Sequence, residues 1–233
     1  MKPSPHPYPQ LISLAVHEVR TPASVVGGYL RMLQSDQDPP MNERQLRMID
    51  QAAKSCERLV AIVAELSEIG KLDSGLIAMA QQPVDLFALI EDAGAGVPEG
   101  ADRNVRLALG GPSCGASIAG DAGRLRAAFD AVFRGILREK PGPAVVVAER
   151  RRETRDGREF AVIIVADEGH AQEARDSEPG AFDDMRGGLG LVLPLARRVI
   201  ERHGGDIWAP AAPAHHEAGD HGVHGSAVIS FPL

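Results

Sequence analysis

Residues 11–33 read LISLAVHEVRTPASVVGGYLRML, and this stretch decides the fold of the first part of the chain. Its apolar residues recur every three or four positions, which is the spacing of one face of an α-helix. His17 and Glu18 place a potential nucleophile beside a potential base. Arg20 and Thr21 follow His17 by three and four residues, so these side chains share one face of the helix. The stretch therefore predicts a helix that carries reactive side chains.

Pro22 lies inside the same helical pattern. It removes a backbone donor, so we expect the helix to kink just beyond His17. A proline in a helix interior costs about 3 kcal/mol, and its presence in so strong a pattern calls for a functional reason.

Two apolar stripes, separated by the turn-forming sequence SDQDPP, predict a helical hairpin. The stripe residues are Leu11, Ala15, Val19, Ala23, Val26, Leu30 and Leu33, followed by Leu46, Ile49, Ala53, Cys56, Val60, Val63 and Ile69. Two helices alone bury little surface, so a homodimer that forms a four-helix bundle is the economical arrangement. The alternative is an ordinary hairpin that packs on the rest of its own chain.

The composition limits the functions that the chain can serve. Its 233 residues suffice for one large or two small domains, and the net charge of -7 argues against nucleic-acid binding. No apolar run is long enough to span a membrane, and the Pro-rich lead-in over residues 1–10 contains no signal core. Cys56 and Cys114 lie far apart in sequence. We therefore expect two buried free cysteines, no disulfide framework and a cytoplasmic location.

A linker at residues 74–83 separates the hairpin, residues 11–73, from a second domain over residues 84–233, in which the pattern changes to short helices and strands. The expected helices are 84–96, 121–140 and 190–205, and the expected strands are 105–110, 116–121, 143–151, 158–169, 206–210 and 225–233. An Asp-Gly turn joins two of these strands, and a Gly-Gly pair closes the last helix. The chain is therefore α+β: a helical hairpin followed by an α/β sandwich with a mixed sheet and helices on one face.

The sequence HEVRTP at residues 17–22 resembles the phosphoacceptor box, H-E-x-R-T-P, of sensor histidine kinases. The order of elements after the hairpin resembles the catalytic ATP-binding domain of the same family, so the resemblance covers nearly the whole chain. It implies that His17 is the phosphorylated residue and that Glu18 accepts or shares its proton. It also implies that Thr21 can orient a hydrolytic water.

The same resemblance implies ATP as the cofactor and names residues that would bind it. Asp167, at the end of an expected strand, would accept a hydrogen bond from the adenine amino group, and Gly169 would let the base approach the backbone. Gly188 and Gly190 belong to a Gly-rich lid before the last helix, a position that suits phosphate binding. Arg138 would supply a positive charge for the phosphates, or lie on an ordinary solvated face.

The chain departs from the family at three places. Ala131 and Gly135 replace two asparagines, the first of which normally binds Mg²⁺, and alanine offers that ion no oxygen. Ala171 stands where the family has a further glycine. Aligned without a gap, Val192 takes the place of the last lid glycine, whereas a two-residue insertion restores Gly188-Leu189-Gly190-Leu191. The nucleotide half therefore departs more from the family than the phosphoacceptor half, and Mg²⁺ is a doubtful cofactor.

Three functions fit these residues. The first is a histidine protein kinase that uses ATP to phosphorylate His17 and passes the phosphoryl group to an aspartate of a response-regulator receiver domain. The second is a histidine phosphotransfer or scaffold protein with a degenerate ATP domain, and the third is a response-regulator phosphatase. Little chain precedes His17, so a separate sensor protein would supply the signal unless the chain is a fragment of a longer sensor kinase.

Two features stay open on the residues alone. Phe182 either packs the lid or is a surface aromatic in a loose loop. The histidines near the C-terminus fit a solvated loop better than a metal site, because no cysteine or spaced carboxylate cluster completes one. They are His215, His216, His221 and His224.

Overall fold

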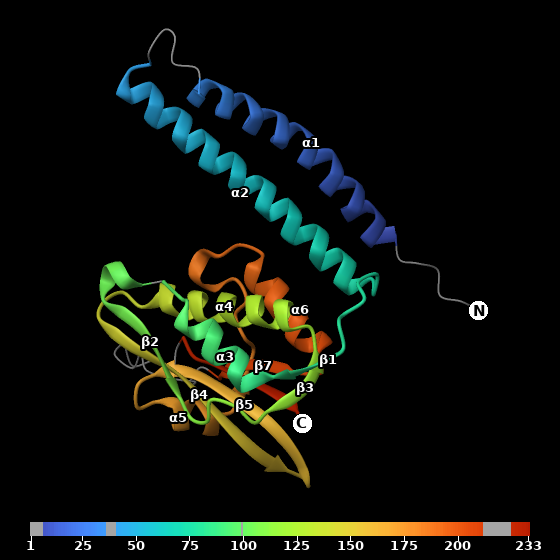
Figure 1. The fold of residues 1–233 in the computed structure, drawn as a ribbon, viewed down its shortest axis with the longest axis vertical. Coiled ribbons are helices and arrows are strands. Elements are labelled where there is room, and N and C mark those ends of the chain that lie inside the picture. The colour runs from blue at the N-terminus through green and yellow to red at the C-terminus, as the bar shows by residue number, and fades with distance from the viewer. Residues whose placement is uncertain (1–6, 36–40, 99, 212–224) are drawn as a thin grey trace, which may run out of the picture. The chain divides into compact units, whose positions relative to one another are not determined.

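The computed structural model describes residues 7–35, 41–98, 100–211 and 225–233. The chain divides into two compact units, Met1–Ile77 and Ala78–Leu233 (Figure 1). Among the described helices, none combines the length and the apolar character that a membrane crossing requires. The C-terminal histidines, His215 to His224, lie outside the described residues.

The first unit is a hairpin of two long helices, α1 (Pro7–Ser35) and α2 (Glu43–Asp73). α1 begins inside the segment that was expected to be a lead-in, because proline suits the first turn of a helix. It continues through Pro22 as one helix, so the proline does not end it. The predicted hairpin is thus confirmed.

The two helices approach closely where small residues meet. The buried Cys56 thiol donates a hydrogen bond to the carbonyl oxygen of Ala23 at 2.9 Å. A Cβ atom on Gly27 would lie 3.3 Å from the Cys56 sulfur, so glycine leaves room for this contact. Cys56 is the buried free cysteine that we expected. The same expectation is wrong for Cys114, which is exposed because it lies in a surface connection of the second unit.

α1 carries two apolar stripes instead of the single one that the spacing predicts. Val16, Ala23 and Gly27 are buried in the hairpin. The second stripe, exposed along its length, contains Ala15, Val19, Val26, Tyr29 and Leu33. Its alternating steps of four and three residues match a coiled-coil seam once Pro22 is included. The prediction of a single stripe was therefore wrong, since Val19, Val26 and Leu33 do not share the buried face of Ala23.

The second unit is built on a mixed sheet. In spatial order its strands are β2 (Val105–Gly110), β4 (Ala144–Arg155), β5 (Arg158–Asp167), β8 (Ala227–Pro232), β7 (Asp206–Pro210) and β6 (Pro179–Gly180). β2 and β4 are parallel, and the other neighbours are antiparallel. β1 (Gln82–Asp85) and β3 (Ser117–Gly120) form a separate antiparallel pair. Asp156 and Gly157, both at positive φ, form the predicted turn between β4 and β5.

Three helices, α3 (Leu86–Ala95), α4 (Ala122–Glu139) and α6 (Val192–Arg202), lie on one side of the sheet (Figure 1). α4 is the central one, since it packs against both α3 and α6. The Phe129 ring of α4 lies 6.1 Å from the Phe133 ring and 6.3 Å from the Phe231 ring of β8, measured between centroids. The contact between Phe129 and Phe231 joins α4 to the sheet.

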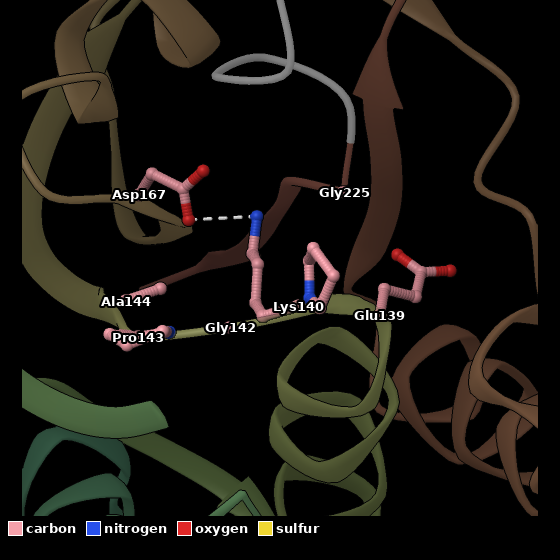
Figure 2. Close-up of a pocket in the computed structure, with 8 residues that line it drawn as sticks. Glu139, Lys140, Gly142, Pro143, Ala144, Asp167 and Gly225 are labelled. Carbon is pink, nitrogen blue, oxygen red and sulfur yellow. Dashed lines mark ion pairs between the residues drawn. The ribbon is translucent and has the colours of Figure 1, made fainter. Parts of the chain in front are cut away.

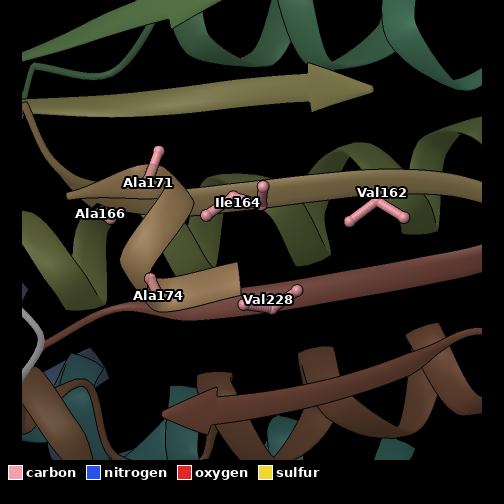
Figure 3. Close-up of a cluster of buried hydrophobic side chains, with 6 residues drawn as sticks. All are labelled: Val162, Ile164, Ala166, Ala171, Ala174 and Val228. Carbon is pink, nitrogen blue, oxygen red and sulfur yellow. The ribbon is translucent and has the colours of Figure 1, made fainter. Parts of the chain in front are cut away.

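The short helix α5 (Ala171–Asp176) lies on the opposite side of the sheet from α4 (Figure 3). It buries a cluster formed by Val162, Ile164, Ala166, Ala171, Ala174 and Val228, against which Phe160 and Trp208 pack. The prediction of helices on one face only was therefore wrong. Ala171 contributes its methyl group to this cluster.

Side-chain caps fix where three helices begin. Asn42 and Gln45 form a capping box at the start of α2, each side chain accepting from the other's backbone N–H at 2.9 Å. Asp85 caps α3, and Asp121 caps α4 by accepting from the backbone of Arg124 at 3.1 Å. The last of these caps sets the position of α4, whose C-terminal end borders the candidate site.

Candidate functional site

The predicted phosphoacceptor residues lie on the surface of α1. His17, Glu18 and Thr21 are all exposed. The Thr21 hydroxyl donates a hydrogen bond to the carbonyl oxygen of His17 at 3.3 Å. Residues two positions apart on a helix point about 200° apart, so His17 and Val19 lie on opposite flanks of α1. A partner that covered the exposed apolar stripe would therefore leave the His17 imidazole accessible.

A second candidate site is a cavity of about 580 Å³ in the second unit. It lies where the end of α4, the end of β5 and the start of β8 meet (Figure 2). Its lining residues are Glu139, Lys140, Pro141, Gly142, Pro143, Ala144, Asp167 and Gly225. Asp167, which was predicted to accept a hydrogen bond from adenine, is thus one of the residues that line this cavity.

Two ion pairs surround the cavity. The Lys140 ammonium lies 2.7 Å from Oδ1 of Asp167, and the two side chains are 9% and 23% exposed. Oε1 of Glu139 lies 3.2 Å from Nε of Arg186. A Cβ atom on Gly225 would lie 3.3 Å from Oε2 of Glu139 and 3.4 Å from Nζ of Lys140. Two cations and two anions therefore neutralise each other around the backbone of Gly225.

Arg186 holds the Gly-rich segment against the body of the unit. Besides the ion pair with Glu139, its guanidinium donates to the carbonyl oxygen of Ser226 at 3.2 Å and lies 5.2 Å from the centroid of the Phe182 ring. Phe182 is buried, so of the two interpretations left open above, packing of the lid is the one observed. The buried Ser226 hydroxyl has no hydrogen-bond partner within the described part of the chain.

The predicted phosphate-binding glycines lie in the segment that leads into α6. Gly188 and Gly190 have φ of 61° and 71°, and Gly169, after β5, has φ of 85°. These left-handed values favour glycine at all three positions. The segment includes a 3-10 turn, η2 (Arg186–Gly188), and Arg138 of α4 donates to the carbonyl oxygen of Gly187 at 3.4 Å. Arg138 therefore contacts the lid and is not among the residues that line the cavity.

The donor set does not fit a protein-bound Mg²⁺. Ala131 is 1% exposed and offers only a methyl group. Its neighbour Asp130 pairs with Arg134 at 3.6 Å and borders a different depression, with Arg126. Glu139 and Asp167 are each neutralised by a cation, and no group of three potential metal ligands exists among the described residues.

Sequence reasoning missed Glu139, Lys140, Arg186 and Ser226. The charged pair directly before Pro141 indicates the end of a helix. The sequence does not indicate which residues these two charges contact. Lys140 reaches Asp167 because β4 and β5 pair with Val146 opposite Asp167, which brings the α4–β4 connection beside that carboxylate. That register is a property of the assembled sheet.

Comparison with known proteins finds relatives of both units of the chain. Residues 10–75 match the family model of the His Kinase A (phospho-acceptor) domain. The chain is 29% identical over 218 residues to the Mycobacterium tuberculosis protein named "Probable sensor histidine kinase TcrY". It is 27% identical over 219 residues to the signal transduction histidine-protein kinase BaeS of Escherichia coli. Residues 10–75 thus belong to the phosphoacceptor domain family of histidine kinases, and most of the chain is similar to sensor histidine kinases of two-component systems.

Solved structures of histidine kinases show a similar fold. The crystal structure of full-length ShkA in complex with AMPPNP has a TM-score of 0.65 at 20% identity, covering 97% of this chain and 45% of that one. Histidine kinase AdeS of Acinetobacter baumannii has a TM-score of 0.53 at 16% identity, with 93% and 96% covered. The chain spans 44% of the length of TcrY and 42% of the length of BaeS, and these matches cover 89% and 84% of the chain itself.

Proposed function

We propose that this histidine kinase phosphorylates itself on His17 and passes the phosphoryl group to an aspartate of a response-regulator receiver domain. The observation that carries the proposal is an exposed histidine on a helix that lies within the matched phosphoacceptor domain. Glu18 follows it directly and is also exposed, so a carboxylate is available to accept or share the imidazole proton.

The proposed reaction has two steps. An imidazole nitrogen of His17 attacks the γ-phosphorus of ATP, a nitrogen–phosphorus bond forms, and the bond to the leaving oxygen of ADP breaks. A receiver carboxylate then attacks the same phosphorus and releases His17. Both steps require an accessible imidazole, and the position of His17 opposite the exposed stripe of α1 supports this.

The cavity in the second unit fits a purine base. Asp167 offers a carboxylate to a ring N–H or amino group, and Gly169 has the φ that lets the backbone turn away from a ligand. Arg138 of α4 donates to the lid at Gly187, and Gly188 and Gly190 of the lid have left-handed φ values, so these residues would meet the phosphates. No group of three potential metal ligands exists among the residues that the structure describes, so the proposal assigns Mg²⁺ no protein ligand.

We propose further that the chain works as a homodimer whose hairpins form a four-helix bundle. The exposed stripe of α1 supports this, because its 3-4 spacing is that of a helix-packing seam and α2 does not cover it in the described hairpin. A receiver domain would then dock on the hairpin near His17.

Labelling with γ-³²P-ATP tests the proposal. We expect acid-labile label on the wild type and on Ser24→Ala, a change at an exposed position of the same helix, and none on His17→Ala. Label that persists in His17→Ala, or that survives acid, would contradict it. If the chain takes phosphate from a phosphorylated receiver domain but never from ATP, it is a phosphotransfer protein instead.

A further inference from the structure

Lys140 lines the cavity and is not among the nucleotide-binding residues that the family resemblance implies. We propose that Lys140 determines base specificity, because its ammonium donates a hydrogen bond to the ring nitrogen beside the adenine amino group. Lys140 and Asp167 together then select adenine over a 6-oxopurine such as guanine. The inference rests on the proposed nucleotide function, because it assumes that Asp167 accepts a hydrogen bond from the adenine amino group.

The cavity presents an acceptor and a donor side by side. Oδ1 of Asp167 and Nζ of Lys140 are 2.7 Å apart, and both residues line the cavity. Figure 2 shows Lys140 extending from the end of α4 toward the Asp167 carboxylate. The ion pair uses only part of the hydrogen-bonding capacity of an ammonium and a carboxylate, so each group can still bind a ligand. A ligand edge must therefore match one donor and one acceptor in a fixed order.

The backbone on both sides of the cavity holds this order. The backbone N–H of Lys140 donates to the carbonyl oxygen of Leu137 at 3.3 Å, which fixes the residue at the end of α4. The backbone N–H of Glu168 donates to the carbonyl oxygen of Val145 at 2.9 Å, which fixes the end of β5 beside the start of β4. Asp167 directly precedes Glu168, so its carboxylate is positioned by the same contact.

The side chain of Lys140 is also held in place. It is 9% exposed, and Gly225 lies against the ammonium, since a Cβ there would be 3.4 Å from Nζ. The neighbouring Glu139 is engaged by Arg186, so it does not draw the ammonium away from Asp167. Withdrawing Lys140 would leave the Asp167 carboxylate without its cation in a partly buried place, which is unfavourable.

Adenine matches the order of the pair. Its 6-amino group is a donor and meets the carboxylate of Asp167. The ring nitrogens on either side of that amino group, N1 and N7, are both acceptors. Whichever of the two edges faces the cavity wall, an acceptor therefore meets the ammonium of Lys140.

A 6-oxopurine presents the opposite order. Its 6-oxo group is an acceptor and would face the carboxylate of Asp167, while its ring N1–H is a donor and would face the ammonium of Lys140. Buried polar groups without partners are costly, so a site of this kind rejects the mismatched base strongly. A base that shifted in its plane to restore the pairing would carry its ribose and phosphates away from the positions that adenine gives them.

Isothermal titration of the whole chain with ATP, 1-deaza-ATP and 7-deaza-ATP tests the inference. Each analogue replaces one ring nitrogen beside the amino group by C–H and keeps the amino group itself. We expect one of the two analogues to bind the wild type at least about tenfold more weakly than ATP, because the ammonium loses its acceptor. In Lys140→Met, ATP should weaken by a similar factor and should then bind no more tightly than that analogue.

GTP provides the second comparison. We expect GTP to bind the wild type at least about a hundredfold more weakly than ATP, and this preference should fall at least about tenfold in Lys140→Met. Lys54→Met is the matched control, because Lys54 forms an ion pair of the same length, 2.7 Å, with Asp50 in the hairpin. It should leave every nucleotide preference unchanged.

The wild-type comparisons need no variant, so a misfolded Lys140→Met leaves the inference testable. Binding of ATP and both deaza analogues with equal affinity would overturn the inference, while labelling of His17 by ATP would still support the proposed kinase function. Tighter binding of ATP to a folded Lys140→Met would also overturn it, because the ammonium would then compete with the base for Asp167. Failure of ATP to bind at all would remove the proposed nucleotide function together with the inference.

Discussion

Asp85 shows how one side chain can hold several segments of the second unit together. Its carboxylate accepts from the backbone N–H groups of Phe87 and Ala88 in α3, at 3.1 and 3.3 Å. It also accepts from Gly115 and Ala116 before β3, at 2.7 and 3.4 Å. Burial works to raise the pKa of Asp85, but the four N–H groups outweigh it and hold the pKa below its ordinary value.

Asp85 should therefore make the second unit sensitive to acid. A carboxyl with a lowered pKa stabilises the folded state above its unfolded pKa of about 4, and that stabilisation is lost as the pH falls through the lower folded value. We expect Asp85→Asn to lower the free energy of unfolding by about 1–2 kcal/mol at pH 7, and by much less near pH 3. Urea unfolding at both pH values measures the difference.

Asp92→Asn is the matched control, because Asp92 lies in the same helix and its carboxylate is mostly exposed, 3.9 Å from Arg126. Its effect should stay within about 0.5 kcal/mol at either pH. Equal effects of the two variants at pH 7 would contradict the role given to Asp85.

Single residues differ in how far the sequence reveals them. The stretch around His17 is a local pattern, so the sequence alone places its residues on one helical face. The partner of Asp167 is not local: Lys140 lies far away along the chain and meets it through strand pairing. Sequence reasoning therefore named Asp167 but not the cation beside it.

The lid and α4 illustrate packing between elements. Gly187, at φ 65°, lies directly on the backbone of Gly135, and a Cβ atom on it would come within 2.8 Å of the Gly135 carbonyl oxygen. A Cβ on Gly135 would in turn lie 3.0 Å from Cδ1 of Leu193. The lack of a side chain on Gly135 lets the lid rest on the helix.

Substitution of two adjacent glycines separates backbone strain from steric overlap. Gly188 has φ 61° but open space around its Cα, so Gly188→Ala should cost about 1–2 kcal/mol from the left-handed backbone alone. Gly187→Ala should cost about 1–3 kcal/mol more, because its Cβ also meets α4. Thermal unfolding of both variants compares them. Equal costs would mean that the lid does not rest on Gly135.

The end of α6 explains a sequence motif in physical terms. His203 accepts from the backbone N–H of Asp121 at 2.9 Å through Nε2, while Nδ1 lies 2.7 Å from the carbonyl oxygen of Val199. Gly204 has φ 76°, and a Cβ on Gly205 would come within 2.5 Å of the Phe231 ring. The sequence predicts the Gly-Gly helix end. It does not reveal that the histidine ties α6 to the start of α4, which again requires tertiary contacts.

At the scale of the whole molecule, the hairpin exposes apolar side chains that its two helices do not bury against each other. Val26 and Tyr29 are 52% and 64% exposed in the middle of the second stripe of α1. A homodimer would bury them, as the sequence predicted from the shortage of core in two helices. The sequence did not separate this stripe from the one that faces α2, because adjacent stripes share the same periodicity.

One charge in that stripe should separate the protomers. We expect Val26→Asp to shift the chain from dimer to monomer in size-exclusion chromatography with light scattering, since an unpaired carboxylate in an apolar seam is costly. Ser24→Asp, on another face of the same helix, should remain dimeric. A wild type that is monomeric at every concentration tested would contradict the proposed bundle.

The chain contains a single tryptophan, Trp208 of β7, which packs on the cluster beneath α5. Its indole emission therefore reports on one face of one sheet, and the long hairpin contributes nothing to that signal. Far-ultraviolet circular dichroism, by contrast, is dominated by helices and draws heavily on α1 and α2. Followed together through a denaturant titration, the two optical signals can distinguish melting of the hairpin from melting of the sheet without any label.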